Sequence, residues 1–337
     1  MQTAKPTPNS KPLSLKTSNS VGIALGSGGG RGLAHLGVFK YLAEIGVKPA
    51  FVAGTSAGSI VGAAYACGRI EELTQIAENA DWKFMAKIFG EVGIHRSGFF
   101  TGRQVEKFFR SFYPVSEIGD LDIPFAAVAT DYRRNREVVI DEGDLVEAIR
   151  ASISIPGVFT PVRRNGRYLL DGALVNPVPV SVVRKMGAKT VIGVDVNLAP
   201  GKGIPEPMPR KAERHFQQSL RRLRNRLDEL AEANPRTAAA LESARELITQ
   251  YQDAPTLVEV LLQTTRLAEN EMTRSRLEAD KPDILIQPAV GDVATLDFTN
   301  AGDCIRAGYE AARAACGSFL PEASGREEIG RFGGKSL

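Results

Sequence analysis

Cysteine and histidine are both scarce in this chain, and long apolar runs are missing. Three cysteines among 337 residues are too few for the disulfide framework of a secreted protein, and their odd number prevents full pairing, so we expect a cytoplasmic location. No stretch approaches the roughly 18 apolar residues that a membrane-spanning helix needs. Only three histidines are present, which leaves few candidates for a histidine general base.

Charge is nearly balanced, which argues against a nucleic-acid partner. The formal net charge is +3, and no recognised nucleic-acid-binding motif accompanies it. Basic residues gather between Arg210 and Arg226, interleaved with a leucine stripe. Two interpretations stay open for this segment. It is either an amphipathic helix in peripheral contact with an anionic membrane, or a helix that packs its leucines on a neighbour and exposes its arginines.

The clearest motif is the G-x-S-x-G from Gly54 to Gly58, with Ser56 at its centre. It follows the apolar run 50–53 and precedes the helix-like segment 59–66. A serine at a strand-to-helix turn, flanked by small residues, is typical of a nucleophile elbow. The alternative is that glycine and serine only pack a tight turn.

A second glycine-rich turn, residues 26–32, follows the apolar segment 22–25 and leads into a predicted helix over 33–45. Successive backbone amides at the start of a helix attract negative charge. A P-loop would end in Gly-Lys-Ser or Gly-Lys-Thr, and a dinucleotide fingerprint would carry glycine where Arg31 stands, so the spacing excludes both. The turn is therefore predicted to supply an oxyanion hole from the amides of Gly28, Gly29 and Gly30.

A serine nucleophile needs a proton acceptor, and the usual histidine is hard to find. His35 falls inside the first predicted helix, His95 lies in a loop, and His215 lies among arginines. Asp171 is the stronger candidate, because it follows a predicted strand and begins an Asp-Gly-Ala turn that lets a carboxylate approach another loop. Burial beside an apolar substrate would raise its pKa from about 3.9. The alternative is an aspartate that binds only the amides of its own turn.

Apolar segments that alternate with helix-like segments predict an α/β fold, with a mainly parallel central sheet and helices on both faces. The predicted strands are residues 22–25, 50–53, 125–129, 137–141, 168–170, 190–196 and 283–287. Ser56 and the glycine-rich turn would then lie at the carboxyl ends of strands, where open α/β sheets bind ligands.

Changes in composition divide the chain into parts. We expect a disordered tail over residues 1–18 and an α/β domain in two segments, 19–200 and 281–317. A helical insertion is expected between these segments, over residues 201–280, and a flexible C-terminal tail over residues 318–337. The first tail lacks the apolar core of a signal peptide. The insertion is predicted to include a helix from Thr256 to about Glu278.

Three motifs in order give the chain a resemblance to the patatin-like phospholipases, in the bacterial branch similar to the catalytic domain of neuropathy target esterase. They are Leu25 to Val38, Gly54 to Ser59 and Asp171 to Ala173. The resemblance implies a serine–aspartate dyad, with Ser56 as nucleophile and Asp171 as base. Such a dyad hydrolyses acyl esters of phospholipids or lysophospholipids without a metal or organic cofactor.

The resemblance leaves several alternatives open. Ser27 stands where the family pattern Gly-Gly-Gly-x-Arg-Gly has its first glycine, so the oxyanion hole depends on the direction of the Ser27 amide. Arg31 either binds a lipid phosphate or braces the loop by bonding carbonyl oxygens. Two other functions stay open: a regulatory or scaffolding protein of low activity that keeps the fold, and acyl transfer to an acceptor other than water. The sequence identifies no protein partner.

Overall fold

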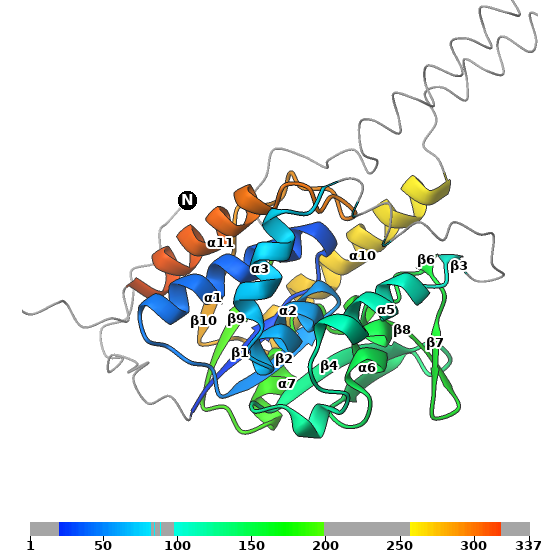
Figure 1. Cartoon of the computed structure of the whole chain (residues 1–337), viewed down its shortest axis with the longest axis horizontal. Coiled ribbons are helices and arrows are strands. Elements are labelled where there is room, and N and C mark those ends of the chain that lie inside the picture. The colour runs from blue at the N-terminus through cyan, green and yellow to red at the C-terminus, as the bar shows by residue number, and fades with distance from the viewer. Residues whose placement is uncertain (1–19, 82–83, 85–87, 89–97, 199–256, 318–337) are drawn as a thin grey trace, which may run out of the picture.

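An eight-stranded mixed sheet forms the centre of the molecule in a computed structural model that describes residues 20–81, 84, 88, 98–198 and 257–317 (Figure 1). The strand order is β10-β9-β1-β2-β4-β8-β7, and β5 pairs with β4. The parallel strands are β1 (Val21–Leu25), β2 (Phe51–Thr55), β4 (Phe125–Asp131), β9 (Thr190–Val194) and β10 (Ile284–Ile286). Antiparallel pairs add β5 (Arg136–Ile140), β7 (Val162–Arg164) and β8 (Arg167–Asp171).

Helices cover both faces of the sheet, because its parallel strands are apolar on both sides. Ile23 and Phe125 face the larger buried cluster, which is completed by α1 (Ala34–Glu44), α2 (Ala57–Ala66), α3 (Ile70–Glu78), α5 (Arg103–Phe112), α6 (Leu145–Ser152) and α11 (Ala301–Cys316). Within this layer, α11 lies along α1 (Figure 1). Ala24 and Ala126 face the opposite cluster, which is completed by α7 (Val180–Lys185) and by Leu277 of α10 (Leu257–Ala279).

The predicted fold class is confirmed, since a mainly parallel sheet with helices on both faces is present. Each predicted strand corresponds to an observed one, with ends that differ by one or two residues. The short strands β3 (Gly98–Phe100) and β6 (Gly157–Phe159), which form a second small sheet, and β7 were not predicted. Three residues are too few for a periodic pattern to show.

Much of the predicted domain organisation falls on residues that the structure does not describe. The tails at 1–18 and 318–337, the basic segment from Arg210 to Arg226 and most of the predicted insertion lie outside the described residues. Helix α10 confirms the helix expected from Thr256 to about Glu278. The domain boundaries themselves stay a prediction. Within the described ranges, no helix is both long enough and apolar enough to cross a membrane.

Candidate active site

Ser56 and Asp171 meet because β2 and β8 end at the same point beside β4. β2 pairs with residues 125–128 of β4 and β8 pairs with residues 129–131 on the same side, since β5 occupies the other side. The two strands run in opposite directions, so their carboxyl ends face each other. The Ser56 hydroxyl donates a hydrogen bond to Asp171 Oδ2 at 2.6 Å.

The turn that carries Ser56 has the backbone of a nucleophile elbow. Ser56 adopts φ 53° and ψ −121°, which is a strained conformation for a residue with a side chain. The flanking glycines are required by close packing, because a Cβ on Gly54 would lie 2.3 Å from the Gly58 carbonyl oxygen, and one on Gly58 would lie 2.1 Å from the Leu25 carbonyl oxygen. The strain is held between β2 and α2, which begins at the next residue.

The Asp171 carboxylate divides its two oxygens between its own turn and the serine. Oδ1 accepts the Ala173 amide at 2.9 Å and Oδ2 accepts the Ser56 hydroxyl, so the aspartate binds an amide of its own turn and contacts the serine at the same time. The side chain is only 1% exposed. Burial, helped by the negative charge of Glu269, raises the pKa of Asp171 to about 8, while the two hydrogen bonds oppose that rise.

The glycine-rich turn presents fewer free amides than its sequence predicts. The Gly30 amide donates to the Thr295 carbonyl at 2.9 Å and is therefore occupied. Gly28 and Gly29 have no recorded acceptor among the described residues, and Gly29 adopts φ 57°, which favours glycine. The Ser27 amide donates to the Pro177 carbonyl at 2.9 Å, so this departure from the family pattern removes neither of the two free amides.

Comparison with known proteins identifies the fold family. Residues 23–184 match the family model described as patatin-like phospholipase. These residues form a patatin-like phospholipase domain. An uncharacterized NTE family protein of Mycobacterium tuberculosis is 35% identical over 192 residues, which are 57% of this chain and 53% of that protein. Patatin-like phospholipase domain-containing protein 6 of Homo sapiens is 35% identical over 185 residues, 53% of this chain and 14% of the human protein.

The chain therefore spans about half the length of the bacterial relative and a much smaller share of the human one. Among solved structures, VipD from Legionella pneumophila matches with a TM-score of 0.43 and 13% identity, over 88% of this chain and 66% of VipD.

Arg31 of the patatin-like domain makes the contacts of a loop brace. Its side chain is fully buried, and its guanidinium donates to Val196 O at 3.1 Å, Val293 O at 3.3 Å and Asn197 Oδ1 at 3.2 Å. Burial lowers its pKa to about 10. These contacts join the glycine-rich turn to the segments after β9 and β10.

The histidine in the described part of the patatin-like domain does not contact the dyad. His35 is fully buried, and its Nε2 donates to the Gly26 carbonyl at 2.8 Å. Burial lowers its pKa to about 4, so it is neutral at pH 7. His95 and His215 lie outside the described residues.

Ser152 is a contact of the site that sequence reasoning missed. Its hydroxyl accepts the Ser56 amide at 2.8 Å and donates to the Val128 carbonyl at 2.6 Å, so it ties the strained elbow to β4. Ser152 is the last residue of α6. A serine at the end of a helix carries no pattern of its own, and its partner Ser56 is 96 residues away.

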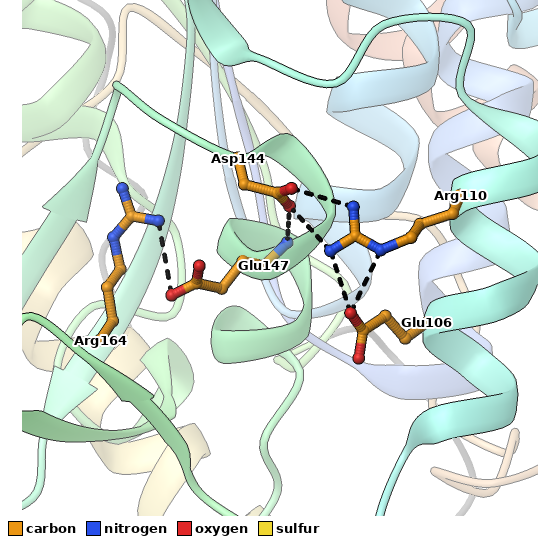
Figure 2. Close-up of polar contacts among 5 residues, drawn as sticks. All are labelled: Glu106, Arg110, Asp144, Glu147 and Arg164. Carbon is orange, nitrogen blue, oxygen red and sulfur yellow. Dashed lines mark hydrogen bonds and ion pairs between the residues drawn. The ribbon is translucent and has the colours of Figure 1, made fainter.

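Helix α6 is itself fixed by a network of ion pairs (Figure 2). Arg110 of α5 contacts Glu106 at 3.0 Å and Asp144 at 2.9 Å, and Asp144 caps α6 by accepting the Glu147 amide at 2.7 Å. Glu147 in turn lies 3.6 Å from Arg164 of β7. The network thus connects α5, α6 and β7 around the helix that ends at Ser152.

Ser56 and Gly29 line an apolar cavity of about 160 Å³. It lies among α1, α2, α3 and α5, and its apolar lining includes Leu36, Ile60, Leu73, Ile76, Phe108 and Phe109. A cavity of roughly 150 Å³ with similar walls binds benzene and excludes water. The polar groups of the site therefore face a compartment suited to hydrocarbon.

Helix α10 brings a second buried carboxylate toward the site. Glu269 is 7% exposed, and burial raises its pKa to about 7 although the charges of Arg31 and Arg266 oppose the rise. Arg276 of the same helix donates to the Val175 carbonyl at 2.8 Å, next to the turn that begins at Asp171. Residues outside the matched segment 23–184 thus shape the electrostatics of the dyad.

Proposed function

We propose that this protein hydrolyses acyl esters of phospholipids or lysophospholipids, with Ser56 as nucleophile and Asp171 as general base. The observation that carries the proposal is the 2.6 Å hydrogen bond from a serine in a strained elbow to a buried aspartate. The carboxylate contacts the hydroxyl directly, so a histidine is not needed to carry the proton between them. Membership of the matched segment in the patatin-like phospholipase family supports the same chemistry.

The first half of the reaction is acylation. Asp171 Oδ2 accepts the hydroxyl proton while Ser56 Oγ attacks the ester carbonyl, and the amides of Gly28 and Gly29 stabilise the negative charge that develops on the carbonyl oxygen. The protonated Asp171 then donates its proton to the departing alcohol, which leaves an acyl group on Ser56. In the second half, Asp171 accepts a proton from water, the hydroxide oxygen attacks the acyl-enzyme, and Ser56 recovers its proton as the fatty acid leaves.

The raised pKa of Asp171 suits it to both proton transfers. An aspartate with a pKa of about 3.9 would be a weak base toward a hydroxyl, whereas a raised pKa strengthens the base and still leaves the protonated carboxyl a far stronger acid than the alcohol that departs. With a pKa of about 8, about one tenth of the molecules carry the ionised base at pH 7, and the fraction rises with pH. Activity is therefore expected to increase through this pH range.

The cavity supports an apolar acyl group as the substrate. Its volume of about 160 Å³ is close to that of a cavity that holds benzene, so it accommodates roughly the first six carbons of a chain. Each buried methylene contributes about 0.8 kcal/mol of transfer free energy. Medium-chain esters should therefore react with a higher kcat/KM than acetyl esters.

Intact-mass labelling with a fluorophosphonate tests the proposal without knowledge of the natural lipid. The wild type should gain one phosphonyl group, and Ser56→Ala and Asp171→Asn should each lose the labelling. Ser111→Ala is the matched control, because Ser111 is an exposed serine on α5 and should be irrelevant to labelling. A folded wild type that stays unlabelled would overturn the hydrolase proposal and favour the regulatory or scaffolding alternative.

A further inference from the structure

Two neighbouring turns carry six arginines and two tyrosines. One turn, residues 132–136, links β4 to β5 and reads Tyr-Arg-Arg-Asn-Arg; the other, residues 163–168, spans the ends of β7 and β8 and reads Arg-Arg-Asn-Gly-Arg-Tyr. Each has its asparagine in the left-handed region, Asn135 at φ 50° and Asn165 at φ 49°. A backbone hydrogen bond of 2.9 Å from Tyr132 to Tyr168 joins them. We name this pair of segments the arginine turns.

The arginine turns lie at the edge of the sheet that carries the dyad. Ser56 follows the carboxyl end of β2, and residue 132 follows the carboxyl end of β4, which is parallel to β2. Strand β8 runs back from the second turn to Asp171, which pairs with Ala129. Because Arg167 precedes Asp171 by four strand residues, the turn projects about 13 Å beyond the dyad in the carboxyl direction.

Half of the arginines have ionic partners within the molecule. Buried Asp131 lies 3.0 Å from Arg134 and 3.9 Å from Arg167. Arg164 contacts Glu147 at 3.6 Å (Figure 2).

The other half are charged groups without such a partner. No ion pair is recorded for Arg133, Arg136 or Arg163 within the part of the chain that the structure describes, and all three side chains are exposed. Glu137, which directly follows Arg136, accepts a hydrogen bond from Asn176 Nδ2 at 2.5 Å instead. The surface therefore keeps an excess of positive charge.

Exposed aromatic rings accompany this charge. Tyr132 is 60% exposed and Tyr168 is 41% exposed, and the Arg133 guanidinium lies over the Tyr168 ring at 5.9 Å. Tyrosine is enriched where a bilayer meets water, because its ring is apolar and its hydroxyl is polar. Arginine at the same depth buries its stem and keeps its charge among lipid phosphates.

We propose that the arginine turns bind the surface of an anionic phospholipid bilayer and hold the edge that carries the dyad against it. The proposal deepens the proposed function, because it states how a lipid hydrolase would meet substrate in a membrane. The occupant is a lipid surface rather than nucleic acid, since the aromatic rings and the arginines without an ionic partner lie on the edge that also carries Ser56 and Asp171, and Ser56 lines an apolar cavity.

Vesicle co-sedimentation of the full chain tests the proposal without turnover, in a Ser56→Ala background that cannot form an acyl-enzyme. Vesicles of phosphatidylcholine with phosphatidylglycerol should bind the protein, and vesicles of phosphatidylcholine alone should bind it far less. An arginine near an anionic surface contributes about fivefold in binding, so changing Arg133, Arg136 and Arg163 together to Gln should weaken binding roughly 100-fold. The corresponding triple change to Lys keeps the charge and should retain most of the binding.

Three exposed lysines provide a matched control at the opposite edge. Lys48 lies just before β2, Lys189 just before β9, and Lys185 ends α7. Changing all three to Gln removes the same charge as the arginine variant but should leave vesicle binding within about twofold of the parent. Equal losses from the two triple variants would overturn the proposal, because net charge alone would then explain binding.

The remaining outcomes separate the two proposals. A protein that is labelled by the fluorophosphonate but binds no anionic vesicles refutes the role of the arginine turns and leaves the hydrolase proposal standing. A protein that binds vesicles through these arginines but is never labelled refutes the hydrolase proposal alone. Binding of an RNA homopolymer that the Gln variant loses, with vesicle binding unchanged, would assign the arginine turns to nucleic acid and overturn the proposal.

Discussion

Replacing Asp171 with Asn should stabilise the protein at neutral pH while it abolishes activity. The physical reason is that Asp171 is a buried carboxylate whose pKa is about 8 in the folded chain, against about 3.9 in an unfolded one. A group whose pKa is raised on folding contributes its full stability below the unfolded pKa, and that contribution is lost as the pH rises through the folded pKa. The loss therefore runs from about pH 4 to about pH 8.

The magnitude follows from the two pKa values. Each pH unit between them costs about 1.4 kcal/mol in the free energy of unfolding. The cost of ionising Asp171 is thus about 1.5 kcal/mol at pH 5 and about 4 kcal/mol at pH 7. Asparagine does not ionise, so Asp171→Asn should exceed the wild type in stability by about these amounts and match it near pH 4.

Asparagine can keep the hydrogen bonds of the site, which makes the comparison clean. Its Oδ1 can accept the Ala173 amide, as Asp171 Oδ1 does at 2.9 Å. Its Nδ2 can donate to Ser56 Oγ, because a hydroxyl accepts as well as donates. The shape of the side chain is unchanged, so the difference between variant and wild type isolates the ionisation of one carboxyl group.

Urea unfolding of both proteins between pH 4 and pH 9 measures the effect, and the difference in free energy of unfolding should rise with pH. Asp131→Asn is a control of opposite sign. Burial raises the pKa of Asp131, but hydrogen bonds led by Arg134 outweigh that effect and lower it, so this variant should be less stable than the wild type at neutral pH. A pH-independent difference for Asp171→Asn would refute the argument that burial holds its pKa near 8.

Four further predictions address other parts of the site. Glu269→Gln removes a negative charge that raises the pKa of Asp171, so the midpoint of the rise of kcat/KM with pH should move to lower pH, and an unchanged midpoint would exclude the coupling. Ser152→Ala removes the acceptor of the Ser56 amide and should lower kcat roughly 10- to 100-fold with a smaller change in KM, as steady-state kinetics would show; equal changes in both would contradict a positioning role. Ile76→Trp should reduce the ratio of kcat/KM for an octanoyl ester over an acetyl ester by roughly tenfold, because it fills the cavity; a constant ratio would mean that the acyl chain binds elsewhere. Gly29→Ala should lose fluorophosphonate labelling and lower the free energy of unfolding by more than about 1 kcal/mol. The added Cβ would lie 2.1 Å from the Thr295 carbonyl oxygen, and the φ of 57° at this position is unfavourable for alanine.

The strands could be predicted from the sequence because buried parallel strands are short apolar runs bounded by glycine-rich turns. The elbow could also be predicted from local sequence, because Gly54 and Gly58 stand where the backbone segments approach too closely for a side chain. The positions of Ser56 and Asp171 could be singled out locally, but their contact joins residues that are 115 apart in the chain. No periodic pattern in the sequence predicts a contact across a separation of that length.

Other features of the site depended wholly on tertiary contacts. The sequence offers Gly28, Gly29 and Gly30 as equivalent donors, and only the approach of Thr295 occupies the last of them. Likewise, the two alternatives for Arg31 differ only in which oxygens surround its guanidinium. The contacts with Asn197, Val196 and Val293 favour the loop brace, and they form because the segments after β9 and β10 pass beside the glycine-rich turn.

The sequence by itself determined the fold class, the strained turn at Ser56 and the candidate dyad, because these depend on local apolar runs and on small residues at fixed spacing. Tertiary structure alone decided that β2 and β8 end face to face beside β4, that α10 adds Glu269 to the field around Asp171, and that two arginine-rich turns lie at the edge that carries the dyad. The physical reason is that strand pairing and burial bring distant residues together, and hydrogen bonds and pKa values depend on those neighbours rather than on the residues next in sequence.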